Sequence, residues 1–155
     1  MVNLTIDGKE ITVSKTATIY EAALEAGIDI PVLCYAKKLL PYGACRVCLV
    51  EVEQMKGRLI PACTTPVTEG MVVTTMSDEI KKVRKTVLEF LLVNHVIDCP
   101  VCDKGGECPL QNQALELMAS GAQSATRFTD VKRTFPKPLR LTSNILLDRD
   151  RCILC

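Results

Sequence analysis

The sequence contains no tryptophan, and aromatic residues make up only 4% of its 155 residues. Apolar cores must therefore rest on valine, isoleucine, leucine and alanine. No uninterrupted apolar run approaches the ~20 residues needed to cross a bilayer, so we expect no direct membrane span. The first residues lack the basic and apolar regions of a secretory signal and are not an arginine-rich transit peptide, which indicates a chain kept in a reducing compartment.

An excess of charge of one sign is also missing, because 19 basic and 18 acidic residues leave a formal net charge of +1. Such a balance produces no global field that would recruit nucleic acid or an acidic substrate. The sequence has no Ser-His-Asp set, no P-loop and no Rossmann glycine fingerprint. We therefore expect no nucleic-acid partner, no catalytic residue and no substrate site in this chain.

Thiols, in contrast, are abundant, since the chain has nine cysteines beside a single histidine. They sort without remainder into three runs: Cys34-x10-Cys45-x2-Cys48-x14-Cys63, His95-x3-Cys99-x2-Cys102-x5-Cys108 and Cys152-x2-Cys155. Disulfides are disfavoured in a reducing compartment, and an odd number of cysteines cannot pair fully. Thiolates at this density commonly hold iron or zinc.

The first run provides the four thiolates that a [2Fe–2S] cluster needs, because each iron takes two terminal ligands besides the bridging sulfides. Gly43 and Ala44, directly before Cys45, are small enough to let the loop wrap the cluster. Backbone N–H groups of such a loop can point at the sulfurs and stabilise the reduced state. The alternative is zinc held by four cysteines, although zinc sites usually pair two C-x2-C motifs and this run has one.

In the second run, His95 and Cys99 are spaced i, i+4 at the expected end of a helix, so both can approach one site. The segment 103–106 then reverses the chain and brings Cys108 back. Three thiolates and a neutral imidazole suit either a [4Fe–4S] cluster or a zinc ion, and the neighbouring runs favour iron. A lone histidine at a helix end is otherwise most often a cap, an alternative that its place in a cysteine run argues against.

The third run, Cys152 and Cys155, contains only two thiolates. Two thiolates cannot close a cluster, so they begin one or form a redox dithiol. A chain that ends on a ligand is typical of a fragment, and we expect further cysteines to follow.

The first half of the chain alternates between strand and turn signals. Residues 2–6 alternate apolar and polar, and Asp7-Gly8 is a strong hairpin signal before a second strand that ends at Val13. A capping box from Thr18 to Glu21 is expected to begin a helix, which Gly27 ends. After an irregular loop over residues 30–46, further strands are expected at 47–53, 58–60 and 71–75. This order predicts a small α+β sheet of β-grasp character.

The second half reads as helical. Ser77 is expected to cap an amphipathic helix of about four turns. Its apolar stripe consists of Ile80, Val83, Val87 and Leu91. Pro109 is expected to be the first residue of a short second helix that runs to about Ala119.

The basic residues favour ordinary interpretations. The run Lys81-Lys82-Val83-Arg84-Lys85 is interpreted as a solvated helix face. A solvated linker, with contact to a partner protein as the alternative, is expected for Arg127, Lys132, Arg133, Lys137 and Arg140. Arg46, between two ligands of the first run, either acts electrostatically on the metal site or packs its stem.

Four stretches of the chain carry a family resemblance: PYGACRVCLV at 41–50, NHVIDCPVCDKGGECPLQ at 94–111, TRF at 126–128 and LDRDRCILC at 147–155. Together they resemble the N-terminal part of the large iron–sulfur subunit (the G-type subunit) of respiratory complex I, NADH:quinone oxidoreductase. The resemblance covers essentially the whole chain, and the middle stretch is the most specific. The family often has proline where this chain has Val96, and it continues beyond Cys155 into further [4Fe–4S] ligation and a large molybdopterin-enzyme-like domain.

The resemblance implies a ligand set for each run. A [2Fe–2S] cluster is ligated by Cys34, Cys45, Cys48 and Cys63, and a [4Fe–4S] cluster by His95, Cys99, Cys102 and Cys108. Another [4Fe–4S] cluster takes its first two ligands from Cys152 and Cys155. The implied domains are a [2Fe–2S] ferredoxin-like β-grasp domain at 1–77, a small helical [4Fe–4S] domain ligated by one histidine and three cysteines at 78–120, a connector at 121–145, and the truncated start of a 4Fe–4S ferredoxin-type segment at 146–155.

The resemblance also implies a role. The chain would be an electron-transfer subunit of an ion-translocating enzyme, relaying electrons from NADH, through flavin in a partner subunit, toward quinone. Its partners would be other subunits of the peripheral arm, on the cytoplasmic side of the membrane. The alternative is the electron-input region of an iron-only hydrogenase or an NAD-dependent formate dehydrogenase, and from a different class, a zinc-stabilised interaction module.

Overall fold

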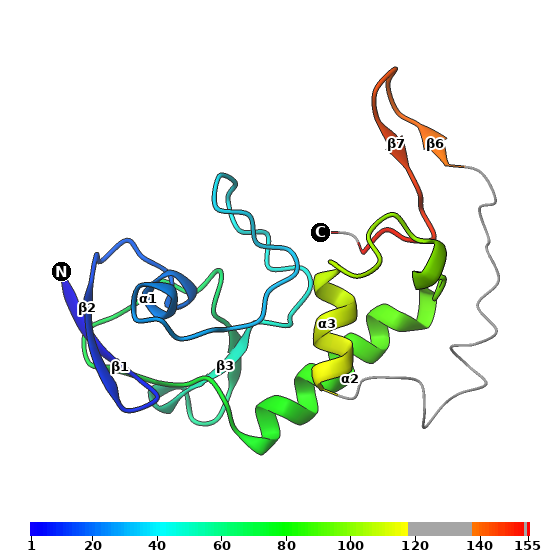
Figure 1. The fold of residues 1–155 in the computed structure, drawn as a ribbon. Helices are drawn as coiled ribbons and strands as arrows, with labels where there is room; N and C mark the ends of the chain where they lie inside the picture. Colours follow the sequence, from blue (N-terminus) through cyan, green and yellow to red (C-terminus); the bar gives the residue numbers. More distant parts are fainter. Residues whose placement is uncertain (118–137, 154) are drawn as a thin grey trace. The chain divides into compact units, whose positions relative to one another are not determined.

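The computed structural model describes residues 1–117, 138–153 and 155 (Figure 1). The chain divides into two compact units, Met1–Arg84 and Lys85–Cys155. Of the residues singled out in the connector, Arg127, Lys132, Arg133 and Lys137 lie outside the described residues, as does the TRF motif at 126–128. Each unit is described on its own.

The first unit begins with a hairpin of strands β1, Val2–Ile6, and β2, Lys9–Val13. The two strands are antiparallel, and the apolar residues of β1 alternate inward as predicted. Asp7 and Gly8 have positive φ angles of 49° and 79°. Two consecutive positive φ angles are what a tight hairpin turn requires, so the Asp-Gly signal is confirmed.

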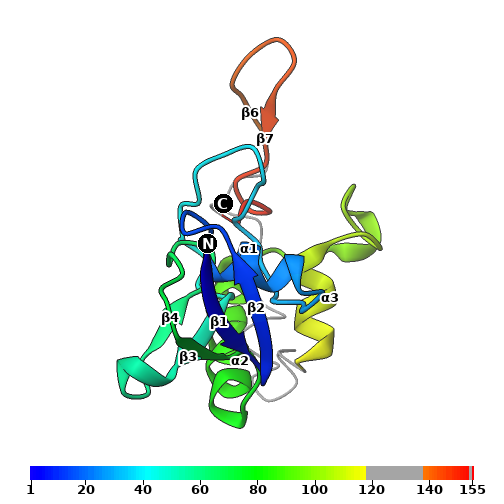
Figure 2. The same cartoon turned by 90° about the vertical axis from the view of Figure 1, so that its left-hand side faces the viewer.

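Five strands form one sheet in the order β2-β1-β5-β3-β4. The remaining strands are β3, Leu49–Val52, β4, Leu59–Pro61, and β5, Met71–Thr74. Strand β1 pairs in parallel with β5, and the other pairings are antiparallel. This mixed sheet, seen from two sides in Figures 1 and 2, confirms the expected α+β class.

Strand β3 is shorter than the sequence predicts at both ends. It begins at Leu49, so Cys48 precedes the strand, and after Val52 the chain turns into a short 3₁₀ helix, η1, at Glu53–Met55. Lys56 follows with a positive φ of 53°. The alternation of apolar and acidic residues in the sequence extends one residue into the turn, which is why the predicted strand is too long at this end.

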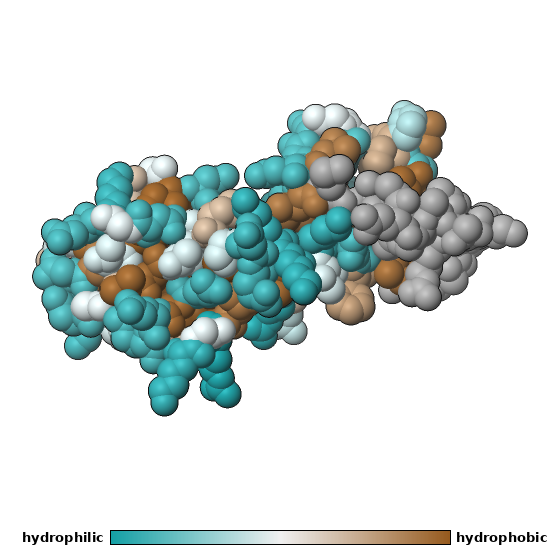
Figure 3. Space-filling view, turned by 90° about the horizontal axis from the view of Figure 1, so that it is seen from below, coloured by the Kyte–Doolittle hydropathy of each residue, from teal (hydrophilic) through white to brown (hydrophobic). Residues whose placement is uncertain are grey.

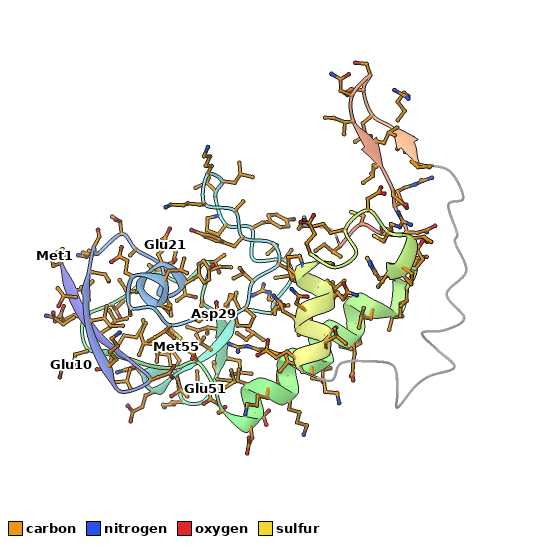
Figure 4. All side chains as sticks on the ribbon, viewed as in Figure 1. Met1, Glu10, Glu21, Asp29, Glu51 and Met55 are labelled. Atoms are coloured by element: carbon orange, nitrogen blue, oxygen red, sulfur yellow. The ribbon has the colours of Figure 1, made fainter. Side chains whose placement is uncertain are left out.

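Helix α1, Ile19–Glu25, packs on one face of the sheet (Figures 1 and 2). The Thr18 hydroxyl accepts the Glu21 N–H at 3.2 Å, and the Glu21 carboxylate accepts the Thr18 N–H at 2.8 Å, which confirms the capping box. Figure 4 labels Glu21 on this helix. The cap fixes the helix start, and Ile19 and Ala22, both 0% exposed, then face the core.

The core of the first unit is aliphatic, as the scarcity of aromatic residues requires. It joins the inward faces of β1, β3 and β5 to helix α1, and it also contains Cys48 and Cys63. Hydrophilic side chains cover most of the face of this unit in Figure 3, with apolar residues showing between them. Two cysteines of the first run are thus part of the hydrophobic core.

Helix α2 spans Asp78–Asn94, and the Ser77 hydroxyl accepts the Ile80 N–H at 3.2 Å, which confirms the expected cap. Its buried positions are Ile80, Arg84, Leu88 and Leu92. These residues follow i, i+4 spacing and form one face. The other members of the predicted stripe, Val83, Val87 and Leu91, are partly buried beside that face.

The interpretation of residues 81–85 as a solvated helix face is wrong for Arg84. Lys81 and Lys82 are exposed, but Arg84 is only 1% exposed. Its guanidinium Nη2 donates to the Leu49 carbonyl oxygen at 2.8 Å. Arg84 lies four residues after buried Ile80 and so shares its face, a placement that helical phase indicates and that the charge run obscured.

The described part of the second unit contains several short elements after helix α2. They are the 3₁₀ helix η2, Cys99–Val101, helix α3, Pro109–Glu116, and strands β6, Leu139–Arg140, and β7, Leu146–Leu147. Pro109 is the first helical residue, as predicted, and the expected end of the helix near Ala119 lies outside the described residues. Among the residues that the structure describes, no helix has the length and apolar character needed to cross a membrane.

Arg84 provides a test of this packing. Arg84→Met keeps a long apolar stem and removes the donor to Leu49, leaving a buried carbonyl without that partner. We expect the free energy of unfolding to fall by about 1–3 kcal/mol, measured by urea unfolding of the anaerobically purified protein with far-UV circular dichroism. Lys81→Met removes the same charge from the exposed face of α2 and should change it by less than about 0.5 kcal/mol; equal losses in both variants would contradict the assignment.

Candidate metal centres

The first cysteine run converges from three places in the first unit. Cys34 lies in the loop after α1, Cys45 and Cys48 lie in the segment before β3, and Cys63 follows the end of β4. All four side chains are buried, with exposed fractions between 1% and 9%. The topology therefore gathers thiols that are up to 29 residues apart in the sequence, from Cys34 to Cys63.

Backbone N–H groups surround the Cys34 sulfur. The Cys45 N–H donates to Cys34 Sγ at 3.5 Å. Burial raises the pKa of the Cys34 thiol, but hydrogen bonds from Cys45, Ala44 and Gly43 lower it, and the net pKa lies below its ordinary value. The expectation that this loop points N–H groups at sulfur is confirmed at this ligand, and such donors stabilise a thiolate.

Two other thiols of the run, those of Cys45 and Cys63, resist ionisation. Burial, followed by the effects of the neighbouring thiols Cys48, Cys34 and Cys45, raises the pKa of Cys63 to about 12. Burial also raises the pKa of Cys45. Several thiolates in one apolar site require a positive partner, and an iron–sulfur core or a metal ion is the group that supplies one.

Gly43 permits the close approach of two ligand-bearing segments. Its φ is +69°, and a Cβ atom built on it would lie 2.9 Å from Thr64 Cγ2. Any side chain would thus meet both an unfavourable backbone conformation and the residue that follows Cys63. The positive φ angle together with this contact favours glycine beside Cys45, where the sequence predicts a small residue.

The arrangement of the thiols bears on the choice between zinc and iron. Across the described parts of the chain, no three His, Cys, Asp or Glu side chains converge tightly enough to hold one metal ion. A zinc ion needs its sulfurs at about 2.3 Å from a common point, whereas a [2Fe–2S] cluster divides four ligands between two irons.

His95 directly follows the end of α2 and is suited to binding a metal as a neutral imidazole. Its Nδ1 atom is buried and has no hydrogen-bond partner within the described structure. Burial lowers the pKa of His95, Asp98 raises it, and Arg151 lowers it again, with a net value below the ordinary one. A buried ring nitrogen that carries a lone pair and lacks a donor fits a metal–ligand bond.

The loop after His95 positions the three thiols of the second run. The Cys102 N–H donates to the Cys99 carbonyl oxygen at 3.3 Å, and the Gly105 N–H donates to that of Cys102 at 2.9 Å. Cys108 is the residue before helix α3. These turns confirm the expected reversal, and they leave the three thiols only partly exposed.

Gly105 is the tightest point of that loop. A Cβ atom built on it would lie 2.4 Å from the Cys99 carbonyl oxygen and 3.1 Å from that of Cys102. Backbone atoms cannot move away without moving the ligands. The sequence placed Gly105 in a reversal, but only the structure identifies it as the residue that lets the loop close.

The third run lies beside the second. Arg151, directly before Cys152, forms an ion pair with Asp98, directly before Cys99, at 2.7 Å. Cys152 is partly exposed and Cys155 is exposed. Sequence reasoning missed this ion pair, because nothing in a single sequence couples two charges 53 positions apart.

Arg46 lies between two thiols of the first run in a left-handed conformation, with φ of 58°. Its side chain is exposed, so it is not packed into the core. The electrostatic role considered from the sequence stays a prediction.

Two family models match the chain. Residues 1–78 match a model described as a 2Fe–2S iron–sulfur cluster binding domain. Residues 84–120 match the NADH-ubiquinone oxidoreductase-G iron–sulfur binding region. The first match covers the unit with four buried thiols, and the second covers His95 and the loop to Cys108.

Curated relatives match over the whole chain. It is 52% identical to the G subunit of NADH-quinone oxidoreductase from Mycobacterium bovis and 50% identical to that from Streptomyces coelicolor. It is 49% identical to the alpha subunit of the NADPH-Fe(3+) oxidoreductase from Geobacter sulfurreducens. Each match covers 100% of this chain but only 18–19% of the relative, so the chain spans about a fifth of their length.

A solved structure supports the same relationship. The crystal structure of an NAD+-reducing [NiFe]-hydrogenase in the H2-reduced state matches with a TM-score of 0.80 and 32% identity, covering 99% of this chain and 62% of that one. Four buried thiols on a mixed sheet and a histidine-led cysteine loop thus occur within regions that bind [2Fe–2S] and [4Fe–4S] clusters. The chain belongs to the 2Fe–2S iron–sulfur cluster binding family and carries the iron–sulfur binding region of the NADH-quinone oxidoreductase G subunits.

Proposed function

We propose that the chain relays electrons between iron–sulfur clusters in an NADH:quinone oxidoreductase. Electrons from NADH would enter through flavin in a partner subunit and leave toward quinone. The observation that supports this best is a set of four buried, mutually interacting thiols in a chain that also carries a histidine with a buried, unpartnered Nδ1. Two metal centres in a chain whose sequence has no substrate-site motif suit a conductor better than a catalyst.

The proposal assigns ligands by residue. The [2Fe–2S] cluster takes Cys34, Cys45, Cys48 and Cys63, and the [4Fe–4S] cluster takes His95, Cys99, Cys102 and Cys108. Cys152 and Cys155 are the first two ligands of another [4Fe–4S] cluster. The corresponding domains are 1–77, 78–120, the connector 121–145 and the segment 146–155. The protein would act in the peripheral arm of a membrane complex, on its cytoplasmic side.

The surrounding polypeptide stabilises the charge at each proposed centre and, at the first, limits the access of water. When bound, each cluster would accept and donate one electron at a time. The N–H groups of residues 43–45 stabilise negative charge on the Cys34 sulfur, and burial among aliphatic side chains keeps water from the sulfurs of Cys48 and Cys63. At the second centre, a neutral imidazole in place of a thiolate makes the site less negative, which favours the reduced state of the cluster.

A second candidate is the electron-input region of an NAD-linked hydrogenase. The structural match to the NAD+-reducing hydrogenase favours it. The same clusters would then connect a nicotinamide site to a hydrogen-activating centre. The two candidates share the ligand assignment and differ in the oxidant.

Analysis of the protein, purified anaerobically in its natural assembly, tests the proposed function. We expect iron and acid-labile sulfide in equal amounts, and electron paramagnetic resonance signals of both cluster types after reduction with dithionite. NADH should reduce the clusters and added quinone should reoxidise them. Reoxidation only by protons with release of hydrogen would support the second candidate, and a colourless assembly with zinc in place of iron would exclude both.

Single ligand replacements should separate the two centres. Cys63→Ser should remove the [2Fe–2S] signal and leave the [4Fe–4S] signal of the second run, because serine is a poor ligand for this core. Cys108→Ser should have the opposite effect. The measurement is the resonance spectrum of each dithionite-reduced variant, with Ser143→Ala, an exposed hairpin residue, as the control. Loss of both signals in either variant would contradict two independent ligand sets.

Replacing glycine by alanine tests the close contacts of Gly43 with Thr64 and of Gly105 with the Cys99 carbonyl oxygen. Gly43→Ala should lose the [2Fe–2S] cluster selectively and Gly105→Ala the [4Fe–4S] cluster, because each added methyl would meet the neighbouring ligand segment. Gly27→Ala is the matched control for Gly43→Ala, since its φ is +72° and nothing lies within 4 Å of its Cβ position. That control should cost only the ~1–2 kcal/mol of a left-handed residue and retain iron. Full iron content in Gly43→Ala would show that the contact with Thr64 is not needed.

A further inference from the structure

The segment before Cys152 is fastened to the loop that carries the second ligand run. Arg151 grips the Asp98 carboxylate with two hydrogen bonds, Nε to Oδ1 at 3.1 Å and Nη2 to Oδ2 at 2.7 Å. Its Nε also lies 3.6 Å from Asp148 Oδ2. A two-point contact between a guanidinium and a carboxylate fixes orientation as well as distance.

A backbone contact strengthens the same attachment. The Val96 N–H donates to the Asp150 carbonyl oxygen at 3.1 Å. Val96 is 6% exposed and Asp150 is 7% exposed. The two contacts at Val96 and Asp98 hold the stretch between His95 and Cys99 from both ends.

The guanidinium lies close to the proposed ligands themselves. Asp98 directly precedes Cys99, and Arg151 Nη2 also lies 3.4 Å from the carbonyl oxygen of Val101, directly before Cys102. Arg151 interacts electrostatically with both His95 and Cys102. One positive charge is therefore held beside two members of a single ligand set.

We infer that Asp98 and Arg151 are positioning residues that set the reduction potential of the [4Fe–4S] cluster held by His95, Cys99, Cys102 and Cys108, and that they join this centre to the ligand run beginning at Cys152. The inference rests on the proposed function.

The sign of the effect follows from charge. Reduction by dithionite adds one electron to a [4Fe–4S]²⁺ cluster and gives [4Fe–4S]⁺, so a nearby cation stabilises the product and raises the potential. The negative charge of Asp98 offsets part of the positive charge of Arg151 and so lowers the potential. The Arg151 and Asp98 side chains are only 20% and 21% exposed, so solvent and salt screen them incompletely.

Potentiometric titration followed by electron paramagnetic resonance tests the inference in the natural assembly. Arg151→Gln should lower the midpoint potential and Asp98→Asn should raise it, each changing the reduction equilibrium constant by up to about tenfold, or about 59 mV for one electron. Arg151→Lys keeps the charge without the two-point grip and should shift the potential less than Arg151→Gln. Arg140→Gln, an exposed hairpin arginine, removes the same charge as a control and should leave the potential unchanged.

Each outcome separates this inference from the proposed function. Opposite shifts in the Arg151→Gln and Asp98→Asn variants support it, because a merely structural pair would move the potential in the same direction or not at all. Unchanged potentials in variants that retain the [4Fe–4S] signal overturn it and leave the ligand assignment standing. If Arg151→Gln loses the cluster, then Arg151→Lys and Asp98→Asn decide by the same criterion. Absence of a [4Fe–4S] signal from the unmodified protein removes the proposed function itself.

Discussion

The burial of four neighbouring thiols is the constraint on which the first unit depends. Cys48 and Cys63 lie in the aliphatic core, and burial, followed by the effects of the neighbouring thiols, raises the pKa of Cys63 to about 12. The polypeptide compensates at Cys34, where backbone N–H groups point at the sulfur. On the proposed ligation, an iron–sulfur core supplies the positive charge that the thiolates need, and fold and cofactor would stabilise each other.

The two centres meet the demand for close ligand packing in the same manner. At each, a glycine sits where a methyl group would collide with a neighbouring ligand segment: Gly43 against Thr64, and Gly105 against the Cys99 carbonyl. Their surroundings differ, however. The first centre is enclosed by a hydrophobic core, whereas the second is held by turns and by the ion pair between Asp98 and Arg151. Burial is therefore the main feature of the surroundings of the first set of thiols, and the fixed charges of Asp98 and Arg151 are the main feature of those of the second.

Local signals in the sequence predicted much of this arrangement. The Asp7-Gly8 turn and the Thr18 capping box are short-range features, so a single sequence reveals them. The spacing of cysteines likewise indicated which thiols belong together, although the ligation itself is a proposal. Burial of Arg84 was missed because a run of cations masked its helical phase, and the contact between Asp98 and Arg151 was missed because it joins positions distant in the chain.

Cys48 and Cys63 belong both to the first cysteine run and to the hydrophobic core, and this has a consequence for how the protein is assembled. They belong to the same core cluster as Val50 and Val73, so an iron–sulfur cluster bound between their sulfurs would be packed against the core. Delivery into a closed core would have to break those aliphatic contacts first. On the proposed ligation, we therefore expect cluster insertion to precede the closing of the core around Cys48 and Cys63.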